Sequence, residues 1–315
     1  MMAKSKICVM GSFVVDLASK AEHLPKRGET VIGSSFVMGP GGKGSNQAVA
    51  AKRAGADVTF ITKIGKDVFG QLAKDNFVKE GLYSPYIFED AEVETGTALI
   101  LVDKESANSI LVVPGACENI TEEEVLACQE ELATSDILLT QLEVNISATM
   151  KAIEIAKAAG SMVVLNPAPV REIPAGLLNQ IDIVTPNEME AAVLSGLPVV
   201  ETIEDCRKAA AYFFEQGVKK VIITWGHNGA YCHDGTTEKH IPVLPQEAID
   251  TTGAGDAFNG CFVAALAQGK DFFDAAIYAT VGASISVTRF GTAPAMAYAS
   301  EIEELYSDFK KKLEG

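Results

Sequence analysis

The residues best suited to chemistry stand in the stretch DTTGAGDAFNG at 250–260. Gly253 and Gly255 bracket a turn, and the residues after it have the composition of a helix start. The N–H groups of such a turn converge, and the helix dipole adds to their attraction for an anion. Asp256 then lies in the first helical turn, where it could be only a favourable charge. Beside an anion site it could also take a proton from an attacking hydroxyl, as phosphoryl transfer requires.

A second glycine-rich turn opens an alanine-rich segment at 39–55. Three of its glycines have the G-x-G-x-x-G spacing of a dinucleotide-binding turn: Gly39, Gly41 and Gly44. Pro40 weakens that interpretation, and the turn does not fit a P-loop because glycine follows Lys43. The turn could simply precede a helix, or it could bring backbone close to a ligand, with Lys43 and Asn46 at the mouth of the helix.

Two further segments follow apolar runs. In TPNEME, Asn187 and Glu190 are three residues apart, so at a helix start they could face the same way and hold Mg²⁺ through waters. The same pair could form a capping box, and both interpretations can hold. The loop TWGHNGA at 224–230 is suited to lie against a nucleotide, although a turn before a hairpin has the same composition.

The elements that must position these residues alternate along the chain. Four nearly continuous apolar runs have the pattern of strands buried in a parallel sheet: 136–143, 161–166, 181–186 and 219–226. Between the first two, Ser147 is a candidate N-cap and Gly160 a candidate helix end, which makes a βαβ unit. The alternation predicts an α/β fold with a doubly wound, mainly parallel sheet. Ligands should gather beyond the carboxyl ends of its strands.

Two stretches do not fit this alternation. Residues 29–39 and 95–115 have the pattern of antiparallel strands, the second as a hairpin around KESAN at 104–108. We expect them to form a small sheet that covers the strand ends as a lid, inserted at about 12–40 and 95–115 into one domain that spans residues 1–315. The alternative is that they are edge strands of the main sheet.

The composition restricts the possible partners. The 315 residues carry a net charge of −16, which argues against nucleic acid or an anionic membrane as the main partner, because both need a basic surface. With 48% hydrophobic residues and no apolar run of membrane-spanning length, the sequence predicts a globular cytoplasmic protein. The six cysteines are scattered along the chain and predict buried free thiols.

In this order, the motifs resemble those of the ribokinase family of ATP-dependent sugar kinases. The segments at 41–56 and 250–260 resemble its two signatures. Shorter stretches also match it: QLE (141–143), NPAP (166–169), TPNE (185–188) and VTRFGT (287–292). The resemblance covers nearly the whole chain. It implies a ribokinase-like α/β domain whose small β-sheet lid covers the sugar and often forms a dimer interface, so we expect a homodimer.

The resemblance also implies roles for individual residues. Asp256 would be the catalytic base on the sugar hydroxyl. The amides of the anion hole would come from Gly253, Ala254 and Gly255. The sugar-binding positions are Val14, Asp16, Gly42, Lys43, Asn46, Glu143 and Asp256. The positions for ATP and Mg²⁺ are Asn187, Glu190, Thr224, Gly226, Gly229, Gly255 and Thr280.

The family often carries an activating monovalent cation, usually K⁺, beside the anion hole. Its ligands here, mostly backbone oxygens, would come from Asp250, Thr252, Ser286, Arg289 and Gly291. Ala295 stands where the family often has serine, which removes one potential oxygen ligand. The resemblance therefore implies ATP, Mg²⁺ and K⁺, with the strength of the K⁺ dependence left open.

Two carboxylates close apolar runs. Asp16 ends GSFVVD, which continues from the apolar residues at 6–10, and Glu143 ends the run at 136–143. An ionised carboxylate accepts hydrogen bonds from two hydroxyls at once, so a sugar would explain an acid at the inner end of a strand. Asn46 would bind a further hydroxyl.

Val14 departs from the family pattern. Ribose-specific members tend to carry asparagine at this position, whereas deoxyribokinases place an apolar residue there. With valine, a 2-hydroxyl loses a partner and a methylene gains a contact, so we expect 2-deoxy-D-ribose as a substrate. D-ribose should also be accepted, because an apolar pocket rejects an added hydroxyl only weakly. Ordinary strand packing is the alternative explanation of Val14.

The leading prediction is an enzyme that transfers a phosphoryl group from MgATP to the 5-hydroxyl of a pentose. A kinase for another furanose or for a nucleoside would use the same fold. A dinucleotide-dependent oxidoreductase would rest on the glycine spacing at 39–44 and would leave DTTGAGD unexplained. A non-catalytic binding protein would have no need of Asp256.

Overall fold

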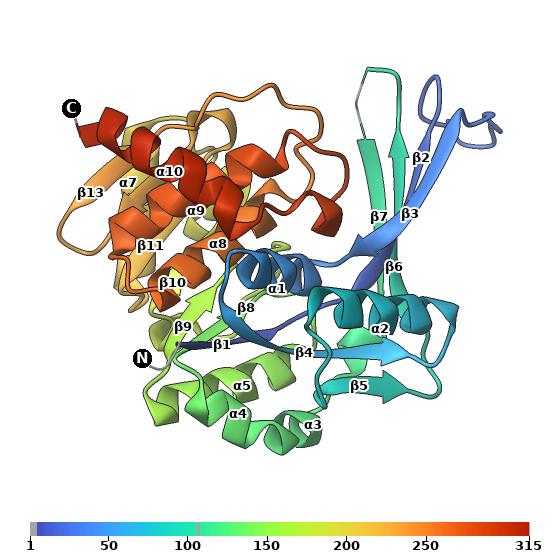
Figure 1. The fold of residues 1–315 in the computed structure, drawn as a ribbon, viewed down its shortest axis with the longest axis horizontal. Helices are drawn as coiled ribbons and strands as arrows, with labels where there is room; N and C mark the ends of the chain where they lie inside the picture. The colour runs from blue at the N-terminus through green and yellow to red at the C-terminus, as the bar shows by residue number, and fades with distance from the viewer. Residues whose placement is uncertain (1–4, 106–107, 315) are drawn as a thin grey trace.

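The computed structural model describes residues 5–105 and 108–314, and within them the chain forms two separate sheets (Figure 1). The larger sheet has nine strands in the order β13-β12-β11-β10-β9-β8-β1-β4-β5. These are β1 (Lys6–Met10), β4 (Asp57–Gly65), β5 (Ile87–Asp90), β8 (Ile137–Thr140), β9 (Met162–Leu165), β10 (Ile183–Val184), β11 (Lys220–Thr224), β12 (Ala230–His233) and β13 (Glu238–Ile241). Neighbours are parallel from β11 to β5, and the hairpin β12–β13 forms an antiparallel edge.

Helices cover both faces of this sheet. Successive side chains of β1 point to opposite faces, so Ile7 and Val9 enter one core and Cys8 and Met10 the other. The first core is completed by α1 (Lys43–Arg53), α2 (Val68–Glu80), α8 (Ala254–Ala267), α9 (Phe272–Ser286) and α10 (Ala299–Glu314). The second is completed by α3 (Glu122–Ala127), α4 (Gln129–Thr134), α5 (Ile146–Ala159), α6 (Glu188–Ser195) and α7 (Ile203–Glu215). The predicted doubly wound α/β fold is confirmed.

Short 3₁₀ helices occur at several connections between these elements. They are η1 (Ala116–Asn119), η2 (Leu178–Gln180), η3 (Gly226–Asn228) and η4 (Ala293–Ala295). The segment between β13 and α8 has neither helix nor strand, and it enters α8 through a turn at Thr252 and Gly253.

The second sheet is small, separate from the first, and projects from the body of the molecule (Figure 1). Its order is β3-β2-β6-β7, with β2 at Val14–Lys20, β3 at Ser35–Gly41, β6 at Thr95–Val102 and β7 at Asn108–Gly115. This excludes the alternative of edge strands in the main sheet. The strand expected at 29–39 begins only at Ser35. The centre of the expected turn KESAN, residues 106 and 107, lies outside the described residues.

The apolar run from Lys6 to Asp16 is not one strand. β1 ends at Met10, the chain crosses to the small sheet through residues 11–13, and β2 begins at Val14. Asp16 therefore lies inside β2 rather than at a strand end. The run is rich in apolar residues because residues 7–10 are buried in the large sheet and residues 13–15 are buried where the small sheet joins it.

Helix α5 confirms the βαβ unit but corrects its cap. The N-cap is Asn145, whose side chain accepts hydrogen bonds from the N–H groups of Ser147 and Ala148. Ser147 is already helical and exposed, so the prediction of Ser147 as N-cap is wrong by two residues. Gly160 ends the helix in the left-handed region at φ 87°, as expected.

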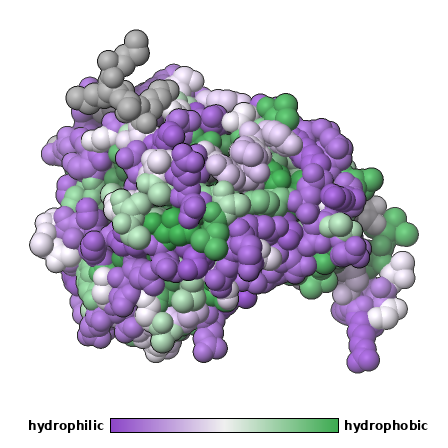
Figure 2. Space-filling view, turned by 90° about the horizontal axis from the view of Figure 1, so that it is seen from below, coloured by the Kyte–Doolittle hydropathy of each residue, from purple (hydrophilic) through white to green (hydrophobic). Residues whose placement is uncertain are grey.

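The surface is mainly hydrophilic on the face seen in Figure 2, where hydrophobic side chains form smaller patches between polar ones. Across the described ranges, no helix combines the length and apolar character needed to cross a membrane. All six cysteines are buried free thiols, as their scatter along the sequence predicted.

Candidate active site

A cavity of about 180 Å³ lies at the carboxyl edge of the large sheet, where the fold predicts ligands. Its lining comes from the segments after β9, β10 and β11 and from the starts of α1, α6 and α8. The lining residues are Lys43, Asn166, Ala168, Asn187, Glu190, Thr224, Thr251, Gly253, Ala254, Gly255, Asp256 and Asn259. The two glycine-rich turns and the TPNEME motif, which are far apart in the sequence, therefore meet at one cavity.

Asp256 lies in the first turn of α8, and 7% of its surface is exposed. The Nδ2 of Asn46 donates to its Oδ2 at 3.0 Å, and the Nε2 of Gln47 donates to its Oδ1 at 2.9 Å. Two amides from α1 thus hold both carboxylate oxygens in a fixed orientation. Its hydrogen-bond partners in the described structure are thus two side-chain amides, while the ammonium of Lys43 interacts with it by charge.

The start of α8 can receive an anion. Gly253 is the N-cap residue in the left-handed region at φ 78°, and no side chain within the described ranges caps the helix. The first-turn amides of Gly255 and Asp256 therefore remain available to a ligand. The N–H of Ala254 instead donates to the carbonyl of Thr251 at 3.2 Å, so one of the three predicted anion-hole amides is used by the turn itself.

A buried amide network supports Asp256, and our sequence analysis missed it. The Nε2 of Gln47 also donates to the Oδ1 of Asn166 at 3.0 Å, and the Nε2 of Gln141 donates to the Oε1 of Gln47 at 2.7 Å. The one signal in the sequence was that Gln47, Gln141 and Asn166 each lie inside a segment that resembles a ribokinase-family motif. A buried stretch on α1, from Gly44 to Ala51, places Gln47 inside the molecule.

Lys43 and Glu143 meet at the start of α1. The backbone N–H of Lys43 donates to the Oε2 of Glu143 at 3.0 Å, and Ser12 donates its hydroxyl to the same oxygen at 2.5 Å. Burial alone would lower the pKa of Lys43. Neighbouring carboxylates outweigh it and raise the pKa above its usual value: Asp256, Glu143 and Glu190. Lys43 is therefore a charged ammonium at neutral pH, in a position to neutralise an anionic ligand.

Asp16 lies beside this cavity on β2. Burial raises its pKa to about 6, and the charges of Asp256 and Glu143 act in the same direction. The hydroxyl of Thr292 opposes them by donating to Oδ2 of Asp16 at 3.1 Å. A side chain at Gly41 would come within 2.2 Å of the Asp16 carboxylate, so glycine at this position leaves room for the carboxylate.

Val14 is the first residue of β2 and pairs with Gly41 of β3, just before Gly42. It is 5% exposed and lies on the same face of β2 as Asp16, two positions away. Gly42 follows at φ 89°, and a Cβ there would collide with the backbone of Phe13 and Val14. The glycine at 42 therefore allows the chain to pass close to β2 before it enters α1.

Asn187 and Glu190 form a capping box at the start of α6. The N–H of Glu190 donates to Oδ1 of Asn187 at 2.7 Å, and the N–H of Asn187 donates to Oε2 of Glu190 at 2.8 Å. Burial raises the pKa of Glu190, and the hydrogen bond from Asn187 opposes it. Both residues also line the cavity, so the structural interpretation is confirmed and the Mg²⁺ interpretation stays compatible with it.

The segments expected to hold K⁺ are neighbours. Asp250 joins them, because its Oδ1 accepts from the N–H of Thr252 and its Oδ2 from the N–H of Gly291, both at 3.0 Å. The side chains of Ser286 and Arg289 point to other partners, the carbonyl of Ala283 and the carboxylate of Glu301. Their backbone oxygens would have to be the ligands, as the sequence analysis expected. Ala295 is buried in η4 and offers no side-chain oxygen.

Three predicted nucleotide residues lie outside the cavity lining. Thr280 is buried in α9 and donates to the carbonyl of Ala276 at 2.9 Å. Gly226 and Gly229 belong to the loop around η3, with φ of 50° and 90°. Their place beside Thr224 is compatible with a nucleotide, but their roles depend on the resemblance alone.

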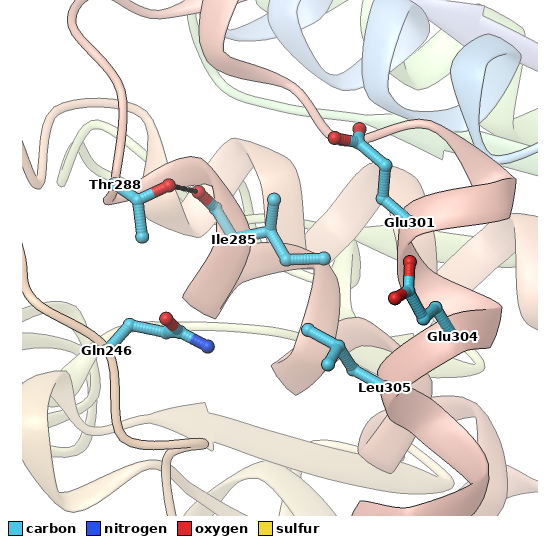
Figure 3. A pocket seen from close by; sticks show the side chains of 6 residues that line it. All are labelled: Gln246, Ile285, Thr288, Glu301, Glu304 and Leu305. Carbon is cyan, nitrogen blue, oxygen red and sulfur yellow. Dashed lines mark hydrogen bonds between the residues drawn. The ribbon is translucent and has the colours of Figure 1, made fainter.

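A larger cavity, about 300 Å³, lies elsewhere, between α9, α10 and the segment before α8 (Figure 3). It is lined by Gln246, Ile285, Thr288, Glu301, Glu304 and Leu305. It contains none of the predicted site residues, and its charged groups are two carboxylates. The smaller cavity, with its helix start and lysine, is the better candidate for phosphate chemistry.

The dinucleotide interpretation of the first glycine turn is not favoured. Gly39 and Gly41 belong to β3, an antiparallel strand of the small sheet, and the turn itself is reduced to Gly42. A dinucleotide fingerprint needs a parallel strand, a glycine turn and a helix in one βαβ unit. The described chain does not have that arrangement. A Cβ on Gly41 would collide with the carboxylate of Asp16, and a Cβ on Gly44 would collide with the backbone of Gly11, whereas Gly39 has open space around it.

Comparisons with known proteins agree with this geometry. The model of the pfkB family carbohydrate kinases matches residues 4–297. The chain is 41% identical over 288 residues to the ribokinase of Haemophilus influenzae, covering 91% of this chain and 94% of that protein. It is 38% identical over 287 residues to the deoxyribokinase of Salmonella typhi, with 91% and 94% covered.

The fold also matches solved structures. The structure of Arabidopsis thaliana ribokinase complexed with ribose and ATP has a TM-score of 0.88 at 30% identity, covering 97% of this chain and 99% of that one. The ribokinase of Thermotoga maritima gives a TM-score of 0.87 at 37% identity, with 96% and 99% covered. The family match and these identities leave no doubt about kinship: the chain belongs to the pfkB family of carbohydrate kinases.

Proposed function

We propose that this protein transfers the γ-phosphoryl group of ATP to the 5-hydroxyl of a pentose. The observation that carries the proposal is Asp256, a carboxylate held by the amides of Asn46 and Gln47 beside the uncapped start of α8. In the reaction, the sugar hydroxyl oxygen attacks the γ-phosphorus, the bond to the β-phosphate oxygen breaks, and ADP leaves. Asp256 receives the hydroxyl proton, and the amides at the start of α8 hold the transferring charge.

The polar groups around Asp256 suit a sugar. The Oδ1 of Asn46 is buried without a hydrogen-bond partner in the described structure, so a donor is missing there. Sugar hydroxyls are donors, and burying an acceptor unpaired costs about 1–3 kcal/mol. Asp16 and Glu143 supply further acceptors, and Lys43 offers a positive charge. We therefore assign sugar binding to these four residues with Gly42 and Val14.

Val14 favours 2-deoxy-D-ribose over D-ribose, with both accepted. Its buried methyl groups face the same side of β2 as Asp16, where a sugar held by that carboxylate would lie. Both names occur among the relatives, ribokinase at 41% and deoxyribokinase at 38% identity, so overall similarity does not decide between the two sugars.

The residues present suit Mg²⁺ and K⁺. We assign Mg²⁺ to Asn187 and Glu190, which line the cavity and carry oxygens of the hard type that Mg²⁺ binds through water. Mg²⁺ there would offset charge on the phosphates. K⁺ would lie among the backbone oxygens of the segments that Asp250 joins, next to the turn before α8. We assign nucleotide binding to Thr224 and the loop after it, with Gly255 next to the phosphates. Thr280, in α9, belongs to the same assignment although it lies outside the cavity lining.

We extend the proposal to the domain organisation, the lid and the pairing of two copies. All 315 residues would act as one unit in which the small sheet is a lid over the sugar, and two copies would pair through that sheet. Six free thiols and the use of ATP support a cytoplasmic location.

An ADP-release screen tests the proposal. It covers ribose, 2-deoxyribose, fructose and nucleosides, each with ATP and with or without K⁺. We expect release with both pentoses and a higher kcat/KM for 2-deoxyribose. Release with nucleosides or fructose alone would contradict the pentose assignment.

Asp256→Asn tests the base directly. We expect kcat to fall by about a hundred- to ten-thousandfold, because the hydroxyl proton loses its acceptor, while ATP binding stays within about twofold of the parent. Asp274→Asn is the matched control, because Asp274 is also an acid in the first turn of a helix, α9, away from the cavity. If Asp256 were only a favourable helix charge, both variants would keep full activity.

A further inference from the structure

Thr292 contacts three segments that the proposed reaction brings together. Its hydroxyl lies 3.1 Å from Oδ2 of Asp16 and 3.0 Å from the carbonyl oxygen of Pro40, both in the small sheet. Its Cα, Cβ and Cγ2 lie 3.4 Å from the place that a Cβ on Gly253 would occupy, at the start of α8. Its chain neighbour Gly291 donates to Asp250 in the segment expected to hold K⁺.

The hydroxyl is placed for a carboxylate. Thr292 is 7% exposed, so water does not replace its partners freely. A hydroxyl has one proton and two nearby acceptors here, and an ionised carboxylate is the stronger acceptor of the two. When Thr292 donates to Oδ2, the other oxygen of Asp16 is left for a ligand hydroxyl.

The charges around Asp16 make this donor important. Asp256 on α8 and Glu143 after β8 face Asp16 as negative groups, and burial acts with them to favour the neutral acid. The ammonium of Lys43 interacts with Asp256 and Glu143. Within the described part of the chain, the recorded side-chain donor to Asp16 is Thr292, so its hydroxyl works against the neutral form.

We propose that Thr292 is a positioning residue for the sugar. Its hydroxyl orients the Asp16 carboxylate, and its carbon atoms pack against Gly253, so that sugar recognition on β2 and the anion-binding turn before α8 are set relative to each other. This inference rests on the proposed function, because it assumes that Asp16 receives a sugar hydroxyl.

Thr292→Val and Thr292→Ser test it, since valine keeps the shape and loses the hydroxyl while serine keeps the hydroxyl. For Thr292→Val we expect the sugar KM to rise about tenfold, with kcat and the KM for ATP within about twofold of the parent. The pKa of Asp16 is about 6 in the parent, and the hydrogen bond from Thr292 lowers it. Without that bond the pKa should rise, so the acid limb of the pH profile of kcat/KM should move to higher pH. Thr292→Ser should restore both readouts.

Thr149→Val is the matched control. Thr149 is also buried and donates its hydroxyl to a backbone carbonyl, that of Asn145 at 2.9 Å, but it lies in α5. It should leave the sugar KM and the pH profile unchanged. An unchanged sugar KM and acid limb in Thr292→Val would overturn the inference, as would equal shifts in Thr149→Val, which would show a general effect of losing a hydroxyl.

Asp16→Asn separates this inference from the proposed function. Suppose that Asp16→Asn raises the sugar KM strongly while Thr292→Val behaves like the parent. That result would reject the positioning role of Thr292 and keep Asp16 as a sugar ligand. If Asp16→Asn had no effect on any sugar, the sugar site itself would be wrong, and the assignment of Thr292 would fall with it.

Discussion

Val14 and Asp16 share one face of β2, so a position proposed to choose between two sugars stands two residues from a carboxylate proposed to bind them. In that proposal, Asp16 binds sugars in general and Val14 selects among them. Asp16 suits any sugar that presents hydroxyls, whereas Val14 distinguishes a hydroxyl from a methylene at a single carbon.

Val14→Asn should therefore move the preference towards ribose. We expect the ratio of kcat/KM for ribose over 2-deoxyribose to rise about tenfold, because the amide gives the 2-hydroxyl a partner and removes the apolar contact of the methylene. Steady-state kinetics with both sugars measures it. Val199→Asn, at an exposed loop position, is the control and should keep the parent ratio. A ratio that does not move in Val14→Asn would leave strand packing as the explanation of Val14.

The sequence predicts the role of a single residue well when the local pattern requires a particular backbone conformation. Gly253 and Asp256 were predicted because a glycine turn before a helix has a recognisable spacing, and the structure places both at the cavity. Gln47, Gln141 and Thr292 could not be predicted in this way. Gln141 and Gln47 are 94 residues apart, and an isolated amide or hydroxyl carries no signal of its distant partner.

Among the elements, the helix starts do most of the positioning. α1, α6 and α8 begin at the same cavity, each from a different kind of turn. α6 is closed by the capping box of Asn187 and Glu190, whereas α8 has no side-chain cap within the described chain. α1 also has no cap from its N-cap residue, Gly42, but its first N–H groups donate to Glu143 and Ser12. The start of α8 lies beside Asp256, and there an anion would complete the hydrogen bonds of the helix.

The cap of α5 provides a stability test with a built-in control. Asn145→Ala should lower the free energy of unfolding by about 1 kcal/mol, because two N–H groups lose their acceptor. Ser147→Ala should change it by less than about 0.5 kcal/mol, because that side chain is exposed and caps nothing. Urea unfolding of both variants measures the difference. Equal losses in the two would show that Ser147 shares the cap.

Element boundaries were the less predictable part of the fold. The apolar pattern from Lys6 to Asp16 is the same for one long strand and for two strands in different sheets, because both are buried. Which sheet β2 joins depends on pairing with β3 and β6, and β6 is about eighty residues away in the chain. In α5, two good capping residues stand two positions apart, and packing of the helix selects Asn145.

The small sheet carries an exposed apolar face. The face of the small sheet opposite Asp16 exposes a group of large side chains, as alternation along paired strands requires: Phe36, Met38, Leu99, Leu101, Leu111 and Val113. Such patches mark interfaces in soluble proteins. The projecting position of this sheet leaves the face open to a second copy (Figure 1).

Leu111→Glu should therefore weaken self-association. Leu111 is 60% exposed on β7, and a buried carboxylate without a partner would oppose pairing of two sheets. We expect the parent to sediment as a dimer at micromolar concentration and the variant to shift towards monomer. Val78→Glu is the control, because Val78 is 65% exposed on α2 and does not belong to this sheet. A parent that sediments as a monomer would contradict pairing through this face.

The division of the proposed site between two sheets has an evolutionary consequence. Val14 and Asp16 belong to the small sheet, while Asp256 and its amide partners belong to helices of the large one. If Val14 sets the choice of sugar as proposed, mutations at that position would alter substrate choice while Asp256 and its amide partners stay unchanged. A lineage on this scaffold would then acquire a new sugar by drift at a single codon, and a laboratory library for that purpose should begin at position 14.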